Sequence, residues 1–240
     1  FAVYQYDLES KQQVRITGNS FEGDDYLLSL SPDGQWLAYV REINGNHWQY
    51  FLYQLATGTS RQLAANSIIP NAITWTPDNQ ALVIAGNTSL WQLSLEGTFE
   101  SLLTKEQGLA ANSLDYSSVS GEIIVEQANN LQSLWQYMNP VLARNSVATQ
   151  PIKVSLGHNE FLPRYANNSK ALAFVSFDGN YTDLMLRKPD GQVIVLAERL
   201  PYDLSLTQLE WSPDDKYLAF SANDRVYLLE IETGLIKPVF

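Results

Sequence analysis

The stretch Leu30-Ser31-Pro32-Asp33-Gly34, followed by Trp36-Leu37-Ala38-Tyr39-Val40, decides the fold of this chain. Proline fixes φ in the turn, serine caps it, and glycine eases the exit into an apolar strand. The stretch recurs in two close copies, Trp75–Asn79 with Ala81–Ala85 and Trp211–Asp215 with Tyr217–Ser221. Each copy therefore predicts two antiparallel strands joined by a tight turn, and the recurrence predicts a repeat architecture.

Five copies are found when the residue before each turn is taken as an anchor. The anchors lie 45, 41, 49 and 46 residues apart, at Leu30, Trp75, Tyr116, Tyr165 and Trp211. Two copies have lost the turn residues, which there read 117–120 and 166–169, but they keep the strand that follows. Third and fourth strands are expected after each copy, joined by turns such as Thr57-Gly58 and Asp190-Gly191. Four short strands in about 40 to 45 residues is the period of a β-propeller blade.

The first 18 residues correspond to the second half of a repeat, because the run at 6–11 aligns with the run at 53–58. We therefore expect one all-β propeller domain over 1–240, six-bladed, whose first blade has only its two outer strands. Its inner strands are expected from sequence upstream of this chain, and the exposed strand edge that they leave could pair with another copy. The expected blade ranges are 1–18, 26–66, 72–104, 112–156, 161–197 and 207–240.

At the turn motifs Ser31–Gly34 and Ser212–Asp214, each with its following strand, the chain resembles the TolB-like β-propeller repeat family, which is related to WD-type repeats. That resemblance implies the propeller fold but carries over no catalytic residue. The functions that it implies are a sensor or interaction domain of a bacterial envelope protein facing the periplasm. One such role is the C-terminal sensor half of a transmembrane winged-helix transcriptional regulator. The alternatives are the substrate-gating propeller of a prolyl-oligopeptidase-type serine peptidase and a freestanding TolB-like periplasmic protein.

Composition argues against several other classes. The net charge is −11 and the 15 basic residues form no cluster, whereas binding of nucleic acid needs a positive stripe, so no direct nucleic-acid contact is expected. No apolar run approaches the roughly 18 residues that span a bilayer, so no membrane insertion by this chain is expected. Cysteine is absent, which removes disulfides and thiolate zinc sites. No cofactor is expected.

The residues needed for catalysis are not grouped in the sequence, and we expect no enzyme. A serine hydrolase needs a nucleophile elbow with a histidine in reach, but no Gly-x-Ser-x-Gly occurs and the two histidines lie in polar loops. The turn resembles the Asp-box of sialidases only loosely, because Pro32 and the spacing to Trp36 fit it poorly. The repeated Asp33, Asp78 and Asp214 suggest a metal site, but aspartate at this turn position more often bonds nearby backbone N–H groups.

A polar column lies one residue before the anchors, on the innermost strand of each repeat. It consists of Ser29, Thr74, Asp115, Arg164 and Glu210. We expect these residues to line the central channel, with Arg164 and Glu210 forming an ion pair. Two interpretations remain open: a structural polar ring and a channel that binds a ligand.

Loops between the second and third strands and between successive repeats are expected to share one face, which would be the partner-binding face. Its candidate residues are His47, Trp48, His158, Phe161, Tyr181 and Tyr202. Aromatic residues beside acidic ones suit a protein interface. The other interpretation is that Trp48, Phe161 and Tyr202 pack back between blades. The expected function is thus non-enzymatic binding of a protein or small ligand.

Overall fold

The structure is a computed structural model that describes residues 2–17, 23–43, 45, 47–86, 89–103, 111–128, 132–137, 152–154, 157, 159–200, 208–223 and 225–239. These residues form two compact units, Phe1–Leu109 and Ala110–Phe240. All the regular secondary structure in these described residues is β-strand. It consists of five four-stranded antiparallel sheets and one two-stranded sheet, so the predicted class, an all-β propeller with an incomplete first blade, is confirmed.

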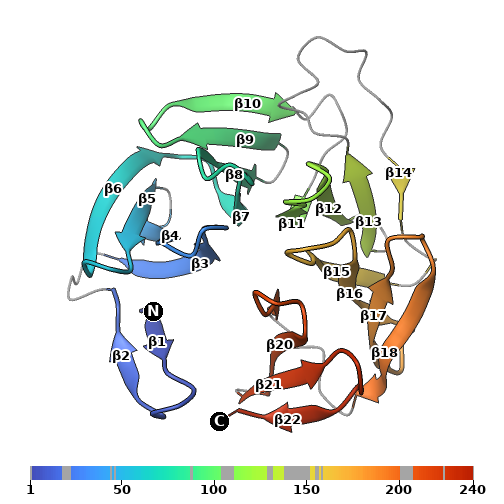
Figure 1. Cartoon of the computed structure of the whole chain (residues 1–240). Helices are drawn as coiled ribbons and strands as arrows, with labels where there is room; N and C mark the ends of the chain where they lie inside the picture. Colours follow the sequence, from blue (N-terminus) through green and yellow to red (C-terminus); the bar gives the residue numbers. More distant parts are fainter. Residues whose placement is uncertain are drawn as a thin grey trace. The chain divides into compact units, whose positions relative to one another are not determined.

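The first unit contains three sheets, labelled in Figure 1. Blade 1 is the pair β1 (Tyr4–Tyr6) and β2 (Gln13–Arg15). Blade 2 runs in the order β3 (Asp24–Leu30), β4 (Trp36–Ile43), β5 (His47–Gln54) and β6 (Thr59–Asn66). Blade 3 runs in the order β7 (Pro70–Trp75), β8 (Ala81–Gly86), β9 (Ser89–Ser94) and β10 (Phe99–Leu103).

The second unit contains three four-stranded sheets. Blade 4 comprises β11 (Ala111–Tyr116), β12 (Ile123–Ala128), β13 (Gln132–Tyr137) and β14 (Ile152–Lys153). Blade 5 comprises β15 (Asn159–Tyr165), β16 (Leu172–Phe177), β17 (Thr182–Arg187) and β18 (Val193–Leu200). Blade 6 comprises β19 (Leu209–Trp211), β20 (Tyr217–Ala222), β21 (Arg225–Glu230) and β22 (Ile236–Pro238). In each sheet the strands pair in chain order.

The first strand of blades 2 and 5 is longer than its sequence pattern predicts, because a β-bulge interrupts the alternation. In blade 2 the register shifts between Tyr26 and Ser29, and Leu27 has a φ of 51°. In blade 5 it shifts between Phe161 and Arg164, and Leu162 also has a φ of 51°. Positive φ is rare for leucine, so the same bulge at the same repeat position indicates a shared backbone design.

The core lies between neighbouring sheets rather than inside any one of them. In the first unit, Val40 and Leu52 of blade 2 pack with Ile73 and Trp75 of blade 3 in one buried cluster. In the second unit a corresponding cluster joins Val175 of blade 5 to blade 6. Both faces of β8 are consequently buried along its whole length. Packing of this kind requires apolar residues on both faces of the second strand, which is what the repeat supplies.

Blade 1 repeats the geometry of the outer half of a complete blade. Its turn is held by the carboxylate of Asp7, which accepts hydrogen bonds from the backbone N–H and hydroxyl of Ser10 at 2.6 and 2.7 Å. Lys11 has a φ of 59° at the position where the turn of blade 2 has Gly58, with a φ of 68°. β1 and β2 therefore correspond to the third and fourth strands of the repeat, as the alignment of 6–11 with 53–58 predicts.

Candidate functional site

Three residues of the polar column meet in the second unit, on the first strands of blades 4, 5 and 6. Arg164 Nε lies 3.0 Å from Glu210 Oε1, so the predicted ion pair is confirmed. Arg164 also donates through Nη1 to the carbonyl oxygens of Pro163 and Leu114, at 2.9 and 3.5 Å. The guanidinium therefore ties together three adjacent first strands.

Asp115 is the third member of this group. Its carboxylate accepts a hydrogen bond from the backbone N–H of Tyr165 in the next blade. Burial raises the pKa of Asp115 to about 6, although the positive charge of Arg164 and the bond from Tyr165 act in the opposite direction. Burial alone would lower the pKa of Arg164, but the carboxylates of Glu210 and Asp115 raise it above its ordinary value. Arg164 is thus charged at every physiological pH.

Glu126 of β12 completes the network and was not singled out by the sequence. This buried carboxylate accepts from the Ser113 hydroxyl at 2.8 Å and from the backbone N–H of Leu162 at 3.3 Å. Leu162 is the bulge residue with positive φ, so Glu126 holds the irregular backbone of the neighbouring blade. The apolar residues around Glu126 predict that its strand lies in the core. A buried carboxylate there needs hydrogen-bond donors such as these.

The other two column residues, Ser29 and Thr74, belong to the first unit. Both are half-buried, on β3 and β7. The carbonyl oxygen of Ser29 accepts a hydrogen bond of 3.0 Å from the indole N–H of Trp75, the anchor of the next blade. The same contact occurs in the second unit, where Trp211 donates to the carbonyl of Arg164 at 3.0 Å. A tryptophan anchor therefore bonds to the first strand of the preceding blade.

The repeated aspartates of the turn have the structural role that the sequence favours. Asp33 accepts from the Ser31 hydroxyl and from the backbone N–H of Gln35 at 3.0 Å. Asp78 and Asp214 make the same pair of contacts with Thr76 and Gln80 and with Ser212 and Lys216. Within the described residues, no three histidine or acidic side chains are grouped so that they could hold a metal ion.

Neighbouring turns are also joined to each other, a feature that the sequence did not reveal. The side chain of Asn79 accepts a hydrogen bond of 3.1 Å from the backbone N–H of Asp33 in the preceding blade. In the second unit Asp215, at the same turn position as Asn79, accepts from the backbone N–H of Asn168 at 2.8 Å. The fourth turn residue thus bridges two blades.

The candidates for the partner-binding face have different environments. Trp48 is only 4% exposed and packs in the core between blades 2 and 3, as in the second of the two interpretations of this residue. Phe161 lies within β15, is half-buried, and packs against the core cluster shared by blades 5 and 6. His47 is exposed at the start of β5. His158 and Tyr202 lie outside the described residues.

Among the tryptophan, phenylalanine and tyrosine candidates that the structure describes, Tyr181 is the exposed one, with 47% of its surface accessible to solvent. The Asp178 carboxylate accepts 2.8 Å hydrogen bonds from the backbone N–H groups of Asn180 and Tyr181, which fixes the turn. The guanidinium of Arg199 lies over the Tyr181 ring, 5.0 Å from its centroid. The backbone N–H of Arg199 donates a 2.7 Å hydrogen bond to the Asp183 carboxylate, which fixes the backbone of Arg199. The pair is an exposed aromatic–arginine surface with a fixed backbone.

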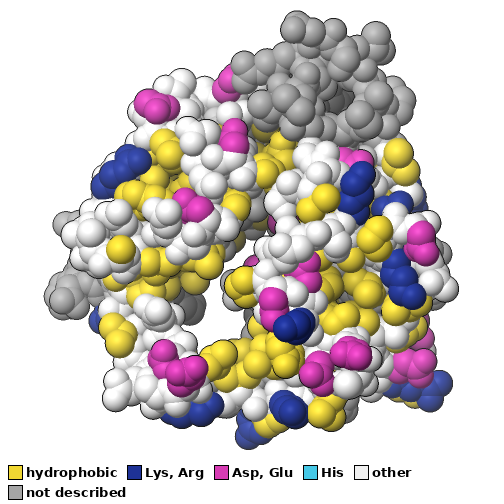
Figure 2. Space-filling view, in the orientation of Figure 1, with side chains coloured by type: hydrophobic (Ala, Val, Ile, Leu, Met, Phe, Trp, Pro, Cys, Tyr) yellow, Lys and Arg dark blue, Asp and Glu magenta, His cyan; other side chains and the backbone are white. Residues whose placement is uncertain are grey.

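Arg199 could not be found from the sequence, because it reaches Tyr181 only through an irregular strand pairing. The register between β17 and β18 shifts on both sides of Leu184, and Arg199 has a φ of 48°. Charged side chains of both signs are dispersed over the face shown in Figure 2.

Solved structures similar to this chain show its fold. TolB from Acinetobacter baumannii superposes with a TM-score of 0.76 at 14% identity, covering 98% of this chain and 58% of that chain. Nidogen in a nidogen/laminin complex gives 0.75 at 10% identity, covering 98% and 88%. The tricorn protease gives 0.74 at 14% identity, covering 100% and 24%. No protein-family model matches the sequence, and no curated protein matches it.

The fold is therefore a TolB-like β-propeller. This chain spans 58% of the TolB chain and 24% of the tricorn protease chain. Because the similar structures include a protease as well as TolB and nidogen, the fold does not by itself decide between binding and catalysis. In the described part of the chain, no helix has the length and apolar character of a membrane span.

Proposed function

We propose that this chain is a non-enzymatic propeller that binds a protein partner through the surface formed by Tyr181 and Arg199. The observation that carries the proposal is that this pair is both exposed and preorganised. Tyrosine and arginine dominate the energetics of protein interfaces, and a fixed backbone reduces the entropy lost on binding. The similarity to nidogen, solved in complex with laminin, supports a binding role for a propeller of this kind.

The role that we propose within this class is a sensor or interaction domain of a bacterial envelope protein facing the periplasm. The similarity to TolB supports it. A finer form of the proposal is the C-terminal sensor half of a transmembrane winged-helix regulator, and a freestanding TolB-like protein is its simplest variant. An alkaline phosphatase fusion to the carboxyl end of the full-length protein tests the compartment, since the enzyme is active only in the periplasm.

Site-specific photo-crosslinking in the host cell tests the binding surface. A photoreactive phenylalanine analogue replaces Tyr181 in one variant and Val195 in a control, because Val195 is 41% exposed on the outer strand of the same blade. We expect a discrete crosslinked protein at position 181, absent at 195 and lost when Arg199→Ala is added. Identical products at both positions, or none at 181, would contradict the proposal.

A second candidate is the substrate-gating propeller of a serine peptidase, which the similarity to the tricorn protease favours. The two candidates differ in what flanks the chain in its full reading frame. A hydrolase region with a Gly-x-Ser-x-Gly elbow supports gating, whereas a winged helix and an apolar 20-residue segment support the regulator.

A further inference from the structure

Two buried nitrogen donors of blade 2 have no acceptor. They are the indole Nε1 of Trp48 and the amide Nδ2 of Asn66, and within the described part of the chain neither has a hydrogen-bond partner. The oxygen of the same amide is occupied, because Asn66 Oδ1 accepts from the backbone N–H of Ile68 at 3.0 Å and from the Tyr50 hydroxyl at 3.5 Å. Buried donors in native proteins are almost always paired, with protein or with a bound molecule. The two nitrogens therefore call for an acceptor that the described residues do not supply.

The two donors lie side by side on one face of the sheet. Trp48 on β5 is paired directly with Asn66 on β6 and with Glu42 on β4. Residues opposite each other on neighbouring antiparallel strands point to the same face, with Cβ atoms about 4.5–5.5 Å apart. That face packs on blade 3, because Trp48 belongs to the core cluster that contains Ile73 and Trp75. Glu42, Trp48 and Asn66 thus form one row, which we call the Trp48 row.

The hydroxyl of Tyr26, on β3, lies close to both Trp48 and Glu42. Burial raises the pKa of Tyr26, the N–H of Trp48 acts against this change, and the charge of Glu42 adds to it. No acceptor, the Tyr26 hydroxyl included, meets the Trp48 N–H with the geometry of a hydrogen bond. Tyr26 and Glu42 are half-buried, so solvent reaches the Trp48 row on the side of β3 and β4.

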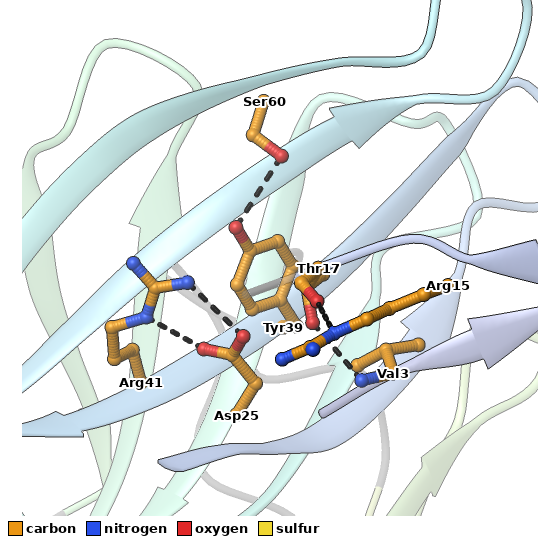
Figure 3. Close-up of polar contacts among 7 residues, drawn as sticks. All are labelled: Val3, Arg15, Thr17, Asp25, Tyr39, Arg41 and Ser60. Carbon is orange, nitrogen blue, oxygen red and sulfur yellow. Dashed lines mark hydrogen bonds and ion pairs between the residues drawn. The ribbon is translucent and has the colours of Figure 1, made fainter. Parts of the chain in front are cut away.

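On the opposite face of the same strands, the polar side chains drawn in Figure 3 are paired with each other. Arg41 Nε and Nη2 donate to the two carboxylate oxygens of Asp25 at 2.7 and 3.0 Å. The Tyr39 hydroxyl lies 3.3 Å from the Ser60 hydroxyl, within hydrogen-bond distance. Asp25 and Arg41 form the pairing next to the Trp48 row, so their side chains alternate to the other face. The unpaired donors are therefore a property of the Trp48 row and not of blade 2 in general.

Blade 5 shows that the fold does not need polar groups in this row. The equivalent pairings there join Thr182 on β17 to Phe177 on β16 and to Leu200 on β18. Leu200 is buried in the cluster shared with blade 6, just as the Trp48 row faces the blade that follows it. Blade 2 therefore has Asn66 where blade 5 has leucine, and Glu42 where blade 5 has phenylalanine. Packing alone gives no reason for either polar residue.

We propose that the Trp48 row is a binding site for a neutral hydroxyl group. The hydroxyl oxygen accepts from the N–H groups of Trp48 and Asn66, and its hydrogen is donated to the carboxylate of Glu42. A carboxylate or phosphate is repelled by Glu42, a carbonyl has no hydrogen to donate, and an ammonium group cannot accept. Water and the hydroxyls of a sugar share this chemistry, and the experiment distinguishes the two sources. The site goes beyond the binding surface of Tyr181 and Arg199, which is on another blade.

The first arm of the test is a high-resolution crystal structure of the protein without added ligand. We expect one oxygen peak within about 3.2 Å of both Trp48 Nε1 and Asn66 Nδ2. Trp48→Phe keeps a ring in the core but removes the N–H, and Asn66→Leu introduces the residue that blade 5 has. The double variant is expected to lose the peak. Gln49→Leu is the matched control, because Gln49 is the strand neighbour of Trp48 on the opposite face, and it is expected to keep the peak.

The second arm titrates the protein with D-galactose in a calorimeter. Saturable binding that the double variant weakens at least tenfold assigns the site to a sugar hydroxyl, whereas the oxygen peak without galactose binding assigns it to water. D-galacturonate carries a carboxylate and is expected to bind at least tenfold more weakly than galactose. The proposal is overturned if the crystal structure shows no oxygen at the two nitrogens, or shows a protein group there instead. It is also overturned if galacturonate binds more tightly than galactose and the double variant abolishes this binding.

Discussion

Arg164 on blade 5 forms an ion pair with Glu210 on blade 6, and the two partners differ sharply in exposure. The side chain of Glu210 is 61% exposed and that of Arg164 only 19%. The carboxylate of Asp115 in blade 4 also acts electrostatically on this guanidinium and raises its pKa. The arginine is therefore the shared cation of a three-blade contact, and its removal has consequences that removal of Glu210 does not.

Glu210→Gln is expected to lower the free energy of unfolding by no more than about 0.5 kcal/mol, because an exposed ion pair is screened by water. Arg164→Leu leaves the half-buried Asp115 without its cation, and the expected cost at pH 7.5 is about 2–3 kcal/mol. At pH 5 the cost is expected to be smaller, since Asp115 is then mostly protonated. Urea denaturation of both variants at the two pH values measures this, and equal costs for the two variants would contradict the assignment.

Asp115→Asn is expected to remove a specific pH dependence of stability. Asp115 has a pKa of about 6 when folded, against about 3.9 for an unfolded aspartate. Between these values the folded chain binds more protons than the unfolded chain, so the free energy of unfolding falls as pH rises through this window. The wild type is expected to lose about 2 kcal/mol between pH 4.5 and 7.5 relative to Asp115→Asn. Parallel stability curves for the two proteins would show that Asp115 titrates normally.

The loss of stability caused by truncating an anchor residue is expected to depend on the blade that contains it. Trp75→Ala removes a buried ring from the core between blades 2 and 3, at an expected cost of about 3–5 kcal/mol. Trp75→Phe keeps most of the packing but loses the bond to the Ser29 carbonyl, at about 1 kcal/mol. Leu30→Ala is expected to change stability by less than about 0.5 kcal/mol, because Leu30 is 54% exposed. Thermal and urea unfolding of the three variants provide the comparison.

Trp48→Ala and Tyr181→Ala are expected to separate stability from binding. Trp48 is a core residue, so its truncation should lower the free energy of unfolding by about 3 kcal/mol or more. Tyr181→Ala should leave the melting temperature nearly unchanged and weaken capture of the crosslinked partner. A stable Trp48→Ala protein would place that ring outside the core.

The strands were predictable from the sequence because the turn residues act locally. Pro32, Asp33 and Gly34 determine one turn through φ, hydrogen bonding and positive φ, and the apolar runs on either side mark the strands. The bulges at Leu27 and Leu162 were not predictable, since leucine gives no local signal for positive φ. For the same reason the first strands of blades 2 and 5 extend several residues beyond the regular alternation.

The ion pair of Arg164 with Glu210 was predictable because adjacent repeats place equivalent positions side by side. Contacts between residues at non-equivalent positions of the repeat could not be predicted from the repeat alignment. Glu126 reaches Leu162 because of the bulge, and Arg199 reaches Tyr181 because two strands shift register. Burial of Trp48 was open to two interpretations, since an aromatic at a strand end can turn to solvent or to the neighbouring sheet.

The hydrogen bonds from the backbone N–H of Asp33 to Asn79 and from that of Asn168 to Asp215 have a practical consequence for engineering. The side-chain amide of Asn79 and the carboxylate of Asp215 each accept a hydrogen bond from the turn of the preceding blade. Duplicating, deleting or transplanting a single module would thus separate bonded neighbours even where every strand is preserved. Any single crossover between two successive turns separates them, so transfer of two successive modules as one piece is expected to preserve the hydrogen bond between their turns.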